Sequence, residues 1–256
     1  MTAAVGTVTV GVSLKAYFGR AQARAWFDAV AAQVATHPAV QSGAVEVFVA
    51  PTYLQIADAL AAFDATPVRV GAQDVSAFGA GAVTGEITAA ELAESGIALA
   101  EIGHAERRRL FGESDADVAA KVAAALAHGV TPLLCLGETD APDAASAATA
   151  AVATVTQLRS ALEDAPGGRV VVAYEPVWAI GAAEPAAPAH IGAVTRALRT
   201  ALDADPARVG STVIYGGSAG PGLLTRLGAD VDGLFLGRFA HDPAALRAVV
   251  DEAATR

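Results

Sequence analysis

Short apolar runs alternate with longer Ala-, Leu- and Val-rich segments along the whole chain. The runs are continuous instead of strictly alternating between apolar and polar residues, which is typical of parallel strands covered by helices. The strands that this pattern predicts are Thr7–Val12, Val45–Ala50, Val68–Gly71, Ile97–Ile102, Thr131–Leu136, Val170–Tyr174, Thr212–Tyr215 and Gly233–Leu236. The clearest predicted helices are Arg20–Thr36, Ala116–His128, Ala144–Glu163 and Ala189–Asp203.

Eight strand–helix units follow one another without a break in composition. A single α/β domain, a (β/α)8 TIM barrel over residues 1–256, explains them more economically than two domains. A doubly wound sheet is the alternative. However, Gly11-Val12-Ser13-Leu14-Lys15 after the first strand lacks the Gly-x-Gly-x-x-Gly spacing of a dinucleotide-binding turn. We therefore expect one barrel.

Composition narrows the cellular setting. Hydrophobic residues make up 54% of the chain and aromatic residues only 5%, so the core must be aliphatic. No apolar run approaches the ~20 residues that cross a bilayer, and no basic segment precedes the first apolar stretch as in a signal peptide. The single cysteine, Cys135, fits a reducing compartment. We expect a cytoplasmic protein without a membrane partner.

Charge and ligand spacing exclude further classes. The formal charge of -10 argues against a nucleic-acid partner, because phosphate backbones need a basic face. The five His and the one Cys show no metal-ligand spacing, so we expect neither a metal nor a cofactor. Only two of the basic residues are Lys. Lys121 lies in an Ala-rich helical stretch and is expected on the solvated surface, whereas Lys15 follows the first strand, where a compact ammonium has a possible use.

The stretch from Tyr174 to Gly181 carries the most specific chemical signal. Glu175 comes at the end of an apolar strand and directly before a Pro-led segment that ends in Gly. A strand end is a rigid mount, and the segment after it is suited to move as a unit. An enzyme would place here a base that must be shielded from water once substrate is bound.

Polar residues follow most of the other predicted strands. Because the carboxyl ends of barrel strands meet on one rim, these residues are expected to converge there. They are Ser13, Lys15, Gln73, Asp74, Glu101, His104, Glu138, Glu175, Ser218, Gly237 and Arg238.

These residues and their spacing resemble the triosephosphate isomerase family, and the similarity covers essentially the whole chain. It is densest at Gly71–Gln73, Gly81–Glu86, Ile102–Arg108, Cys135–Glu138, Tyr174–Gly181 and Tyr215–Ser218. The resemblance implies a TIM barrel and an aldose–ketose isomerase that acts on small sugar phosphates through an enediolate.

The resemblance also assigns roles. Glu175 matches the family's base, His104 matches the neutral imidazole that polarises the carbonyl, and Lys15 matches the lysine that offsets the substrate's charge. Glu106 is expected to steady Lys15. Arg107 and Arg108 are expected to form ion pairs, with Glu86 as a candidate partner.

For the phosphate the family uses backbone N–H groups, which would come here from Gly181, Ser218 and Gly237. Glycine allows the backbone to approach an anion closely. The family also inserts the loop after the third strand into a neighbouring subunit, so Gly79–Glu86, with Thr84 at its tip, predicts a homodimer.

Four positions depart from the family pattern. Ser13 replaces an asparagine that fixes a substrate oxygen, and Ala105 replaces a serine beside the catalytic histidine. Gly181-Ala182-Ala183 replaces Gly-Thr-Gly in the mobile loop. Arg238 replaces the second glycine after the last strand, and its side chain reaches either the phosphate or solvent.

Two substrates fit these departures. The main prediction is the interconversion of dihydroxyacetone phosphate and glyceraldehyde 3-phosphate, because that enzyme is the commoner family member. The alternative is a four-carbon ketose phosphate (erythrulose phosphate) of sugar-alcohol catabolism, for which Ser13 widens the pocket. A remote third hypothesis is a non-catalytic sensor of sugar phosphates, which the retention of Lys15, His104 and Glu175 argues against.

Overall fold

Eight parallel strands close into a barrel in the computed structural model, which describes residues 6–141 and 147–256. Each strand pairs with its neighbour in the sequence, and β1 also pairs with β8. The strands are β1 (Val8–Ser13), β2 (Val45–Ala50), β3 (Arg69–Ala72), β4 (Leu99–Ile102), β5 (Thr131–Leu136), β6 (Val171–Tyr174), β7 (Thr212–Tyr215) and β8 (Gly233–Leu236). The predicted (β/α)8 barrel is confirmed, with strand limits that move by one or two residues.

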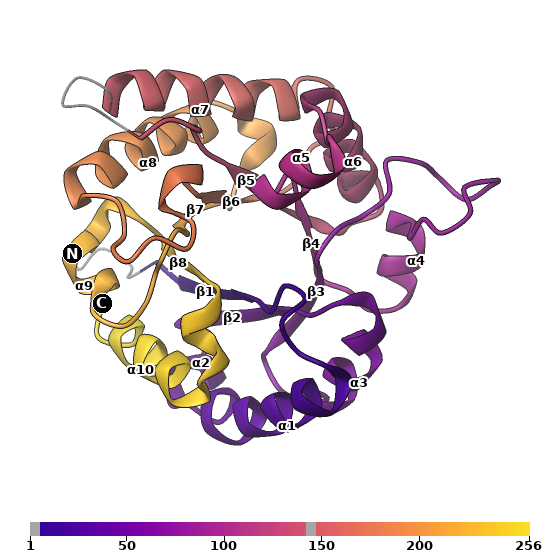
Figure 1. Cartoon of the computed structure of the whole chain (residues 1–256), viewed down its shortest axis with the longest axis vertical. Coiled ribbons are helices and arrows are strands. Elements are labelled where there is room, and N and C mark those ends of the chain that lie inside the picture. Colours follow the sequence, from indigo (N-terminus) through magenta and orange to yellow (C-terminus); the bar gives the residue numbers. More distant parts are fainter. Residues whose placement is uncertain (1–5, 142–146) are drawn as a thin grey trace.

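Helices form a ring around the strands (Figure 1). The α-helices are α1 (Arg20–Val30), α2 (Pro38–Gln41), α3 (Ile56–Ala62), α4 (Ala89–Glu94), α5 (Ala105–Phe111), α6 (Asp115–Ala127), α7 (Ala147–Leu162), α8 (Pro188–Asp203), α9 (Leu223–Leu227) and α10 (Pro243–Ala253). A π-helical turn, η1 (Ala31–Ala35), continues α1, and the 3-10 turns are η2 (Tyr53–Gln55), η3 (Val177–Ala179), η4 (Pro206–Arg208), η5 (Gly228–Asp230) and η6 (Arg238–His241). Among the described helices none is long and apolar enough to cross a membrane.

The helix starts follow local sequence signals. Ser114 and Asp117 form a reciprocal capping box at the start of α6, and Pro188 and Pro243 open α8 and α10. The predicted helix Arg20–Thr36 is regular only to Val30 and then widens into η1. The start predicted at Ala144 lies outside the described residues.

Two apolar layers hold the barrel. One lies between the strands and the helices, and a smaller one fills the barrel interior with Phe48, Leu99, Leu133 and Ile214 among its members. Successive strand residues face opposite layers, so Leu99 points inward and its neighbour Ala100 packs outward. Inside the barrel the ring of Phe48 lies where a side chain at Gly11 would be.

Closure between β1 and β8 requires a close backbone approach. The Thr9 N–H donates to the Asp232 carbonyl at 2.8 Å, and a Cβ at Gly233 would overlap the Thr9 carbonyl. Only glycine therefore fits at the start of β8. The closed ring brings all eight carboxyl ends to one rim, where the site lies.

Candidate functional site

A pocket of about 630 Å³ opens at the carboxyl ends of the strands. Most residues that the sequence assigned to the site line this pocket: Ser13, Lys15, Glu106, Glu175, Gly181, Ser218, Gly237 and Arg238. His104 lies beside Glu175. Four other residues that were expected at this rim do not line the pocket: Gln73, Asp74, Glu101 and Glu138. A larger groove of about 1060 Å³ lies outside, between α7 and α8, and contains none of these groups. Within the described residues, no three His, Cys, Asp or Glu side chains could together hold a metal ion.

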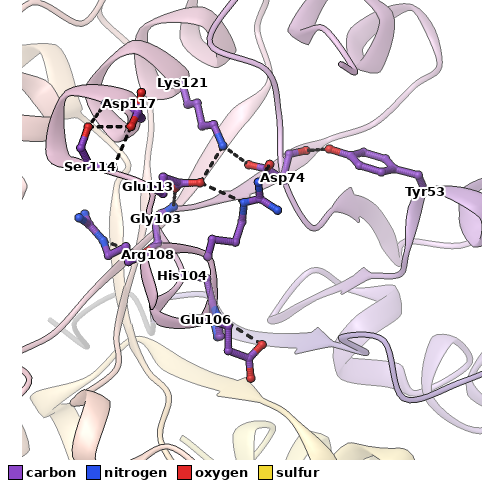
Figure 2. Close-up of polar contacts among 11 residues, drawn as sticks. Tyr53, Asp74, Gly103, His104, Glu106, Arg108, Glu113, Ser114, Asp117 and Lys121 are labelled. Atoms are coloured by element: carbon purple, nitrogen blue, oxygen red, sulfur yellow. Dashed lines mark hydrogen bonds and ion pairs between the residues drawn. The ribbon is translucent and has the colours of Figure 1, made fainter. Parts of the chain in front are cut away.

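His104 is fixed in orientation by the start of α5. It caps that helix, and its Nδ1 accepts the backbone N–H of Glu106 at 3.1 Å (Figure 2). Because Nδ1 is an acceptor, the neutral ring carries its proton on Nε2. Nε2 is buried, has no hydrogen-bond partner in the described part of the chain, and lies 3.7 Å from Glu175 Oε2. A donor thus points into the site.

Glu175 is held between two glycines on the neighbouring strands. A Cβ at Gly216 would lie 2.6 Å from its Cγ and Oε1, and one at Gly137 would overlap its backbone carbonyl. The Glu175 N–H continues the sheet by donating to the Leu136 carbonyl at 2.8 Å. Its buried Oε2 has no hydrogen-bond partner among the described residues. An unpaired acceptor therefore faces the unpaired donor of His104.

Lys15 reaches the same point from β1. Its φ of 47° lies in the left-handed region that a non-glycine residue seldom adopts, and such strain is often found at functional sites. Nζ donates to Glu106 Oε1 at 2.9 Å. Burial disfavours the charged form, but the bond to Glu106 and the negative Glu175 outweigh it, so the pKa of Lys15 lies above its ordinary value. The ammonium is therefore a permanent cation.

Three residues that line the pocket have backbone N–H groups without an acceptor within the described residues: Gly181, Ser218 and Gly237. Ser218 has a φ of 52°, and its hydroxyl donates to the carbonyl of Ala182 at 2.6 Å. The segment after Glu175 is thereby held against the turn after β7. The exposed Arg238 places its Nη2 3.7 Å from where a Cβ of Gly181 would be.

The sequence comparisons identify the family. The profile described as triosephosphate isomerase matches residues 8–253. This chain belongs to the triosephosphate isomerase family. An L-erythrulose-1-phosphate isomerase of Pectobacterium atrosepticum is 46% identical over 97% of this chain and 96% of its own length. A triosephosphate isomerase of Mycobacteroides abscessus is 42% identical over 77% and 79%, and an L-erythrulose-1-phosphate isomerase of Mesorhizobium japonicum is 38% identical over 77% and 79%. These relatives support an isomerase.

In this triosephosphate isomerase family member, Glu101 is the residue to which sequence reasoning gave no role. It lies on β4, two residues after the inward-facing Leu99, and is 3% exposed. Ser13 Oγ donates to its Oε2 at 2.9 Å, and its Oε1 lies 3.8 Å from His104 Nε2. Burial raises the pKa of Glu101 to about 7, although His104 opposes the change. Because side chains alternate between the two faces of β4, a residue two positions after the inward-facing Leu99 could have been predicted to face the barrel interior.

Lys121 is buried, so the expectation of a solvated surface residue is wrong. Its Nζ donates to Asp74 Oδ1 at 2.7 Å and to Glu113 Oε2 at 2.8 Å (Figure 2). Glu113 also accepts the Gly103 N–H at 3.0 Å, which braces the turn that presents His104. The Ala-rich pattern of α6 does not reveal this face, because its acidic partners come from other segments.

The two arginines after His104 form ion pairs as expected, but with other partners than Glu86. Arg107 pairs with Asp74 at 2.7 Å and with Glu113 at 3.0 Å. Arg108 pairs with Asp115 at 2.7 Å. Both arginines thus support the turn before α5 and lie outside the pocket lining.

Glu138 follows β5 but belongs to a separate cluster. It accepts from the Tyr174 hydroxyl at 3.1 Å and from Trp178 Nε1 at 3.0 Å, and its Oε1 lies 2.9 Å from His190 Nε2. These contacts anchor η3, the first turn after Glu175. Glu138 therefore positions the start of the segment that covers the pocket.

Gly216→Ala is expected to lower the turnover number strongly and the melting temperature only slightly. The new Cβ displaces only the flexible end of Glu175, so the melting temperature should fall by less than about 5 °C. Misplacing a reacting group by about 1 Å costs on the order of 100-fold in rate, so kcat should fall by that factor. Gly6→Ala, whose Cβ meets no atom within 4 Å, is the control. Unchanged turnover in Gly216→Ala would contradict the tight fit around Glu175.

Proposed function

We propose that this chain moves a proton between adjacent carbons of a small sugar phosphate, and that its substrate is a four-carbon ketose phosphate of the erythrulose 1-phosphate type. One observation carries the chemistry. His104 Nε2 and Glu175 Oε2 are both buried, neither has a partner among the described residues, and they lie 3.7 Å apart beside the cation of Lys15.

In the proposed reaction Glu175 removes a proton from the carbon beside the carbonyl. His104 Nε2–H donates to the carbonyl oxygen, where negative charge develops, and Lys15 offsets that charge. The proton then returns to the neighbouring carbon, and the proton of the adjacent hydroxyl group passes to the former carbonyl oxygen, so the substrate is rearranged without any external oxidant or reductant. No group beyond these side chains is needed for this step.

The fourth carbon changes what the product is. In erythrulose 1-phosphate the carbonyl is C2, and C1 carries the phosphate ester in place of a free hydroxyl. The enediol therefore forms between C2 and C3, and its collapse moves the ketone to C3. The product of such a substrate is another ketose phosphate, so the expected aldose–ketose reaction applies only to the triose.

Two observations favour the four-carbon substrate over the triose that was the main prediction. The L-erythrulose-1-phosphate isomerase of Pectobacterium atrosepticum is similar over 97% of this chain, compared with 77% for the Mycobacteroides triosephosphate isomerase. The short side chain of Ser13 lines the pocket where the family pattern has asparagine. The triose remains the second candidate, since the triosephosphate isomerase relative is 42% identical.

The phosphate would bind to backbone donors. Gly181, Ser218 and Gly237 line the pocket in the turns after β6, β7 and β8, and their N–H groups have no acceptor among the described residues. Backbone N–H groups suit an anion in a chain of formal charge -10, because they add positive potential only locally. Arg238 lies close enough to Gly181 to add a cation on the same side.

Glu175→Gln is expected to lower kcat by about 10²–10⁴-fold, because it removes the base while keeping its shape. Binding of inorganic phosphate, measured by calorimetry, should stay within about threefold of the native value. Near-native turnover in the variant would show that another group is the base.

Parallel assays on erythrulose 1-phosphate and dihydroxyacetone phosphate test the substrate. We expect kcat/KM to be about 10- to 100-fold higher for the four-carbon compound, since a hydrogen bond to a charged group is worth about 1.5–3 kcal/mol. Product should be identified by NMR, which distinguishes a ketose from an aldose phosphate. A preference for the triose would return the assignment to the main sequence prediction.

We also propose a homodimer formed through the loop after β3. This loop protrudes from the barrel beside α4 (Figure 1), and Thr84 within it is exposed. Exposed apolar side chains follow the first three strands at this end of the barrel: Tyr17 (54% exposed), Leu54 (86%) and Phe78 (60%). Hydrogen bonds from Gln73 Nε2 to the Lys15 carbonyl and from the Tyr53 hydroxyl to the Asp74 carbonyl tie the three loops together.

Sedimentation should give a species of twice the 25.5 kDa chain mass at micromolar concentration. Phe78→Asp should produce monomers with lower kcat, because a buried charge at an interface is costly and Lys15 lies on a loop bonded to this one. Leu110→Asp, at another exposed apolar position on α5, is the control and should stay dimeric. A fully active native monomer would contradict the proposal.

A further inference from the structure

Glu101 is a buried ionisable group that the proton transfer described above does not use. It faces the barrel interior two residues after Leu99 and is paired in register with Leu133 on β5, and only the Ser13 hydroxyl is seen to donate to it in the described part of the chain. A carboxyl group in such a place costs free energy unless its oxygens are paired. We therefore expect a bound ligand to donate a hydrogen bond to the carboxyl oxygen of Glu101 that Ser13 leaves unpaired.

The position of Glu101 points to one part of the substrate. The proposed phosphate donors follow β6, β7 and β8, and in the closed ring β4 lies across the barrel from β8. A substrate anchored by its phosphate at those turns extends toward β4. Its reacting carbons lie at His104 and Glu175, so any further carbon reaches toward Glu101, whose Oε1 is 3.8 Å from His104 Nε2.

Ser13 connects the pocket to Glu101. It is the last residue of β1, and its side chain is short. Ser13 lines the pocket and also donates to Glu101 Oε2 at 2.9 Å, which fixes the carboxyl group and leaves its other oxygen free to accept. The arrangement is therefore an oriented acceptor at the end of the substrate path.

We propose that Glu101, oriented by Ser13, binds the terminal hydroxyl group of a four-carbon ketose phosphate and so selects it over the three-carbon compound. This inference rests on the proposed function, and it adds a specificity-determining residue to that site. Glu101 takes no part in the proton transfer itself. The hydroxyl group donates to Oε1 while Ser13 donates to Oε2, so both carboxyl oxygens are paired.

The test pairs a protein change with a matching substrate change. Glu101→Leu removes the acceptor at similar volume, and 4-deoxy-erythrulose 1-phosphate removes the hydroxyl group. We expect either change alone to lower kcat/KM about 10- to 100-fold, and both together to cost no more than one, because they delete the same contact. The ratio of kcat/KM for erythrulose 1-phosphate to kcat/KM for dihydroxyacetone phosphate should fall by the same factor in the variant.

Two controls distinguish binding from a structural role. Glu46→Gln neutralises a carboxylate at the other end of the barrel, where it pairs with Arg69 and Arg169, and it should leave the substrate ratio unchanged. Glu101→Leu should keep the melting temperature within about 5 °C of the native value, because removing a buried ionisable group offsets the loss of one hydrogen bond from Ser13. Glu101→Gln, which keeps an acceptor oxygen, should restore part of the four-carbon activity if Glu101→Leu folds poorly.

The outcomes separate this inference from the proposed function. If the native enzyme fails to turn over erythrulose 1-phosphate, both are overturned. If it does turn that compound over, but Glu101→Leu lowers kcat/KM equally for the full and the deoxy substrate, or for neither, the role of Glu101 alone is overturned.

Discussion

Closure of the sheet between β1 and β8 is the constraint on which the rest of the structure depends. It requires glycine at position 233, where the backbone of the first strand leaves no room for a side chain. Once the ring is closed, groups far apart in the sequence become neighbours. Ser13 meets Glu101 across 88 residues, and Lys15 meets Glu106 across 91. The site is a consequence of that closure, because no single segment holds more than part of it.

Much of this arrangement could be predicted from the sequence. Apolar runs fixed the limits of β2, β5, β7 and β8, and the rule that barrel strands present their carboxyl ends on one rim brought Lys15, His104 and Glu175 together. The burial of individual charged side chains was harder to predict. Lys121 and Glu101 are charged residues whose burial depends on partners from other elements, and a one-dimensional pattern carries no record of those partners.

The electrostatics of the site follow from its crowding with carboxyl groups. Glu101, Glu106 and Glu175 lie around one Lys15, so the centre of the pocket is no attractive place for a phosphate dianion. Positive potential is instead available at its edge, from unpaired backbone N–H groups and the exposed Arg238. This separation suits a substrate with an anionic end and a neutral, proton-exchanging end, and it orients the substrate before any specific contact forms.

Selection between a three-carbon and a four-carbon substrate then depends on which buried polar groups of the site lack a hydrogen-bond partner in each complex. An apolar wall distinguishes one missing carbon by only about 1–3 kcal/mol. A site built to pair with a hydroxyl group discriminates more strongly, because the shorter substrate leaves a desolvated acceptor without a donor. Glu101 accepts a hydrogen bond from Ser13 and is almost fully enclosed, so water has little access to replace the missing hydroxyl group. The same carboxyl group that strains the barrel interior when the pocket is empty would thus favour the longer substrate when it is filled.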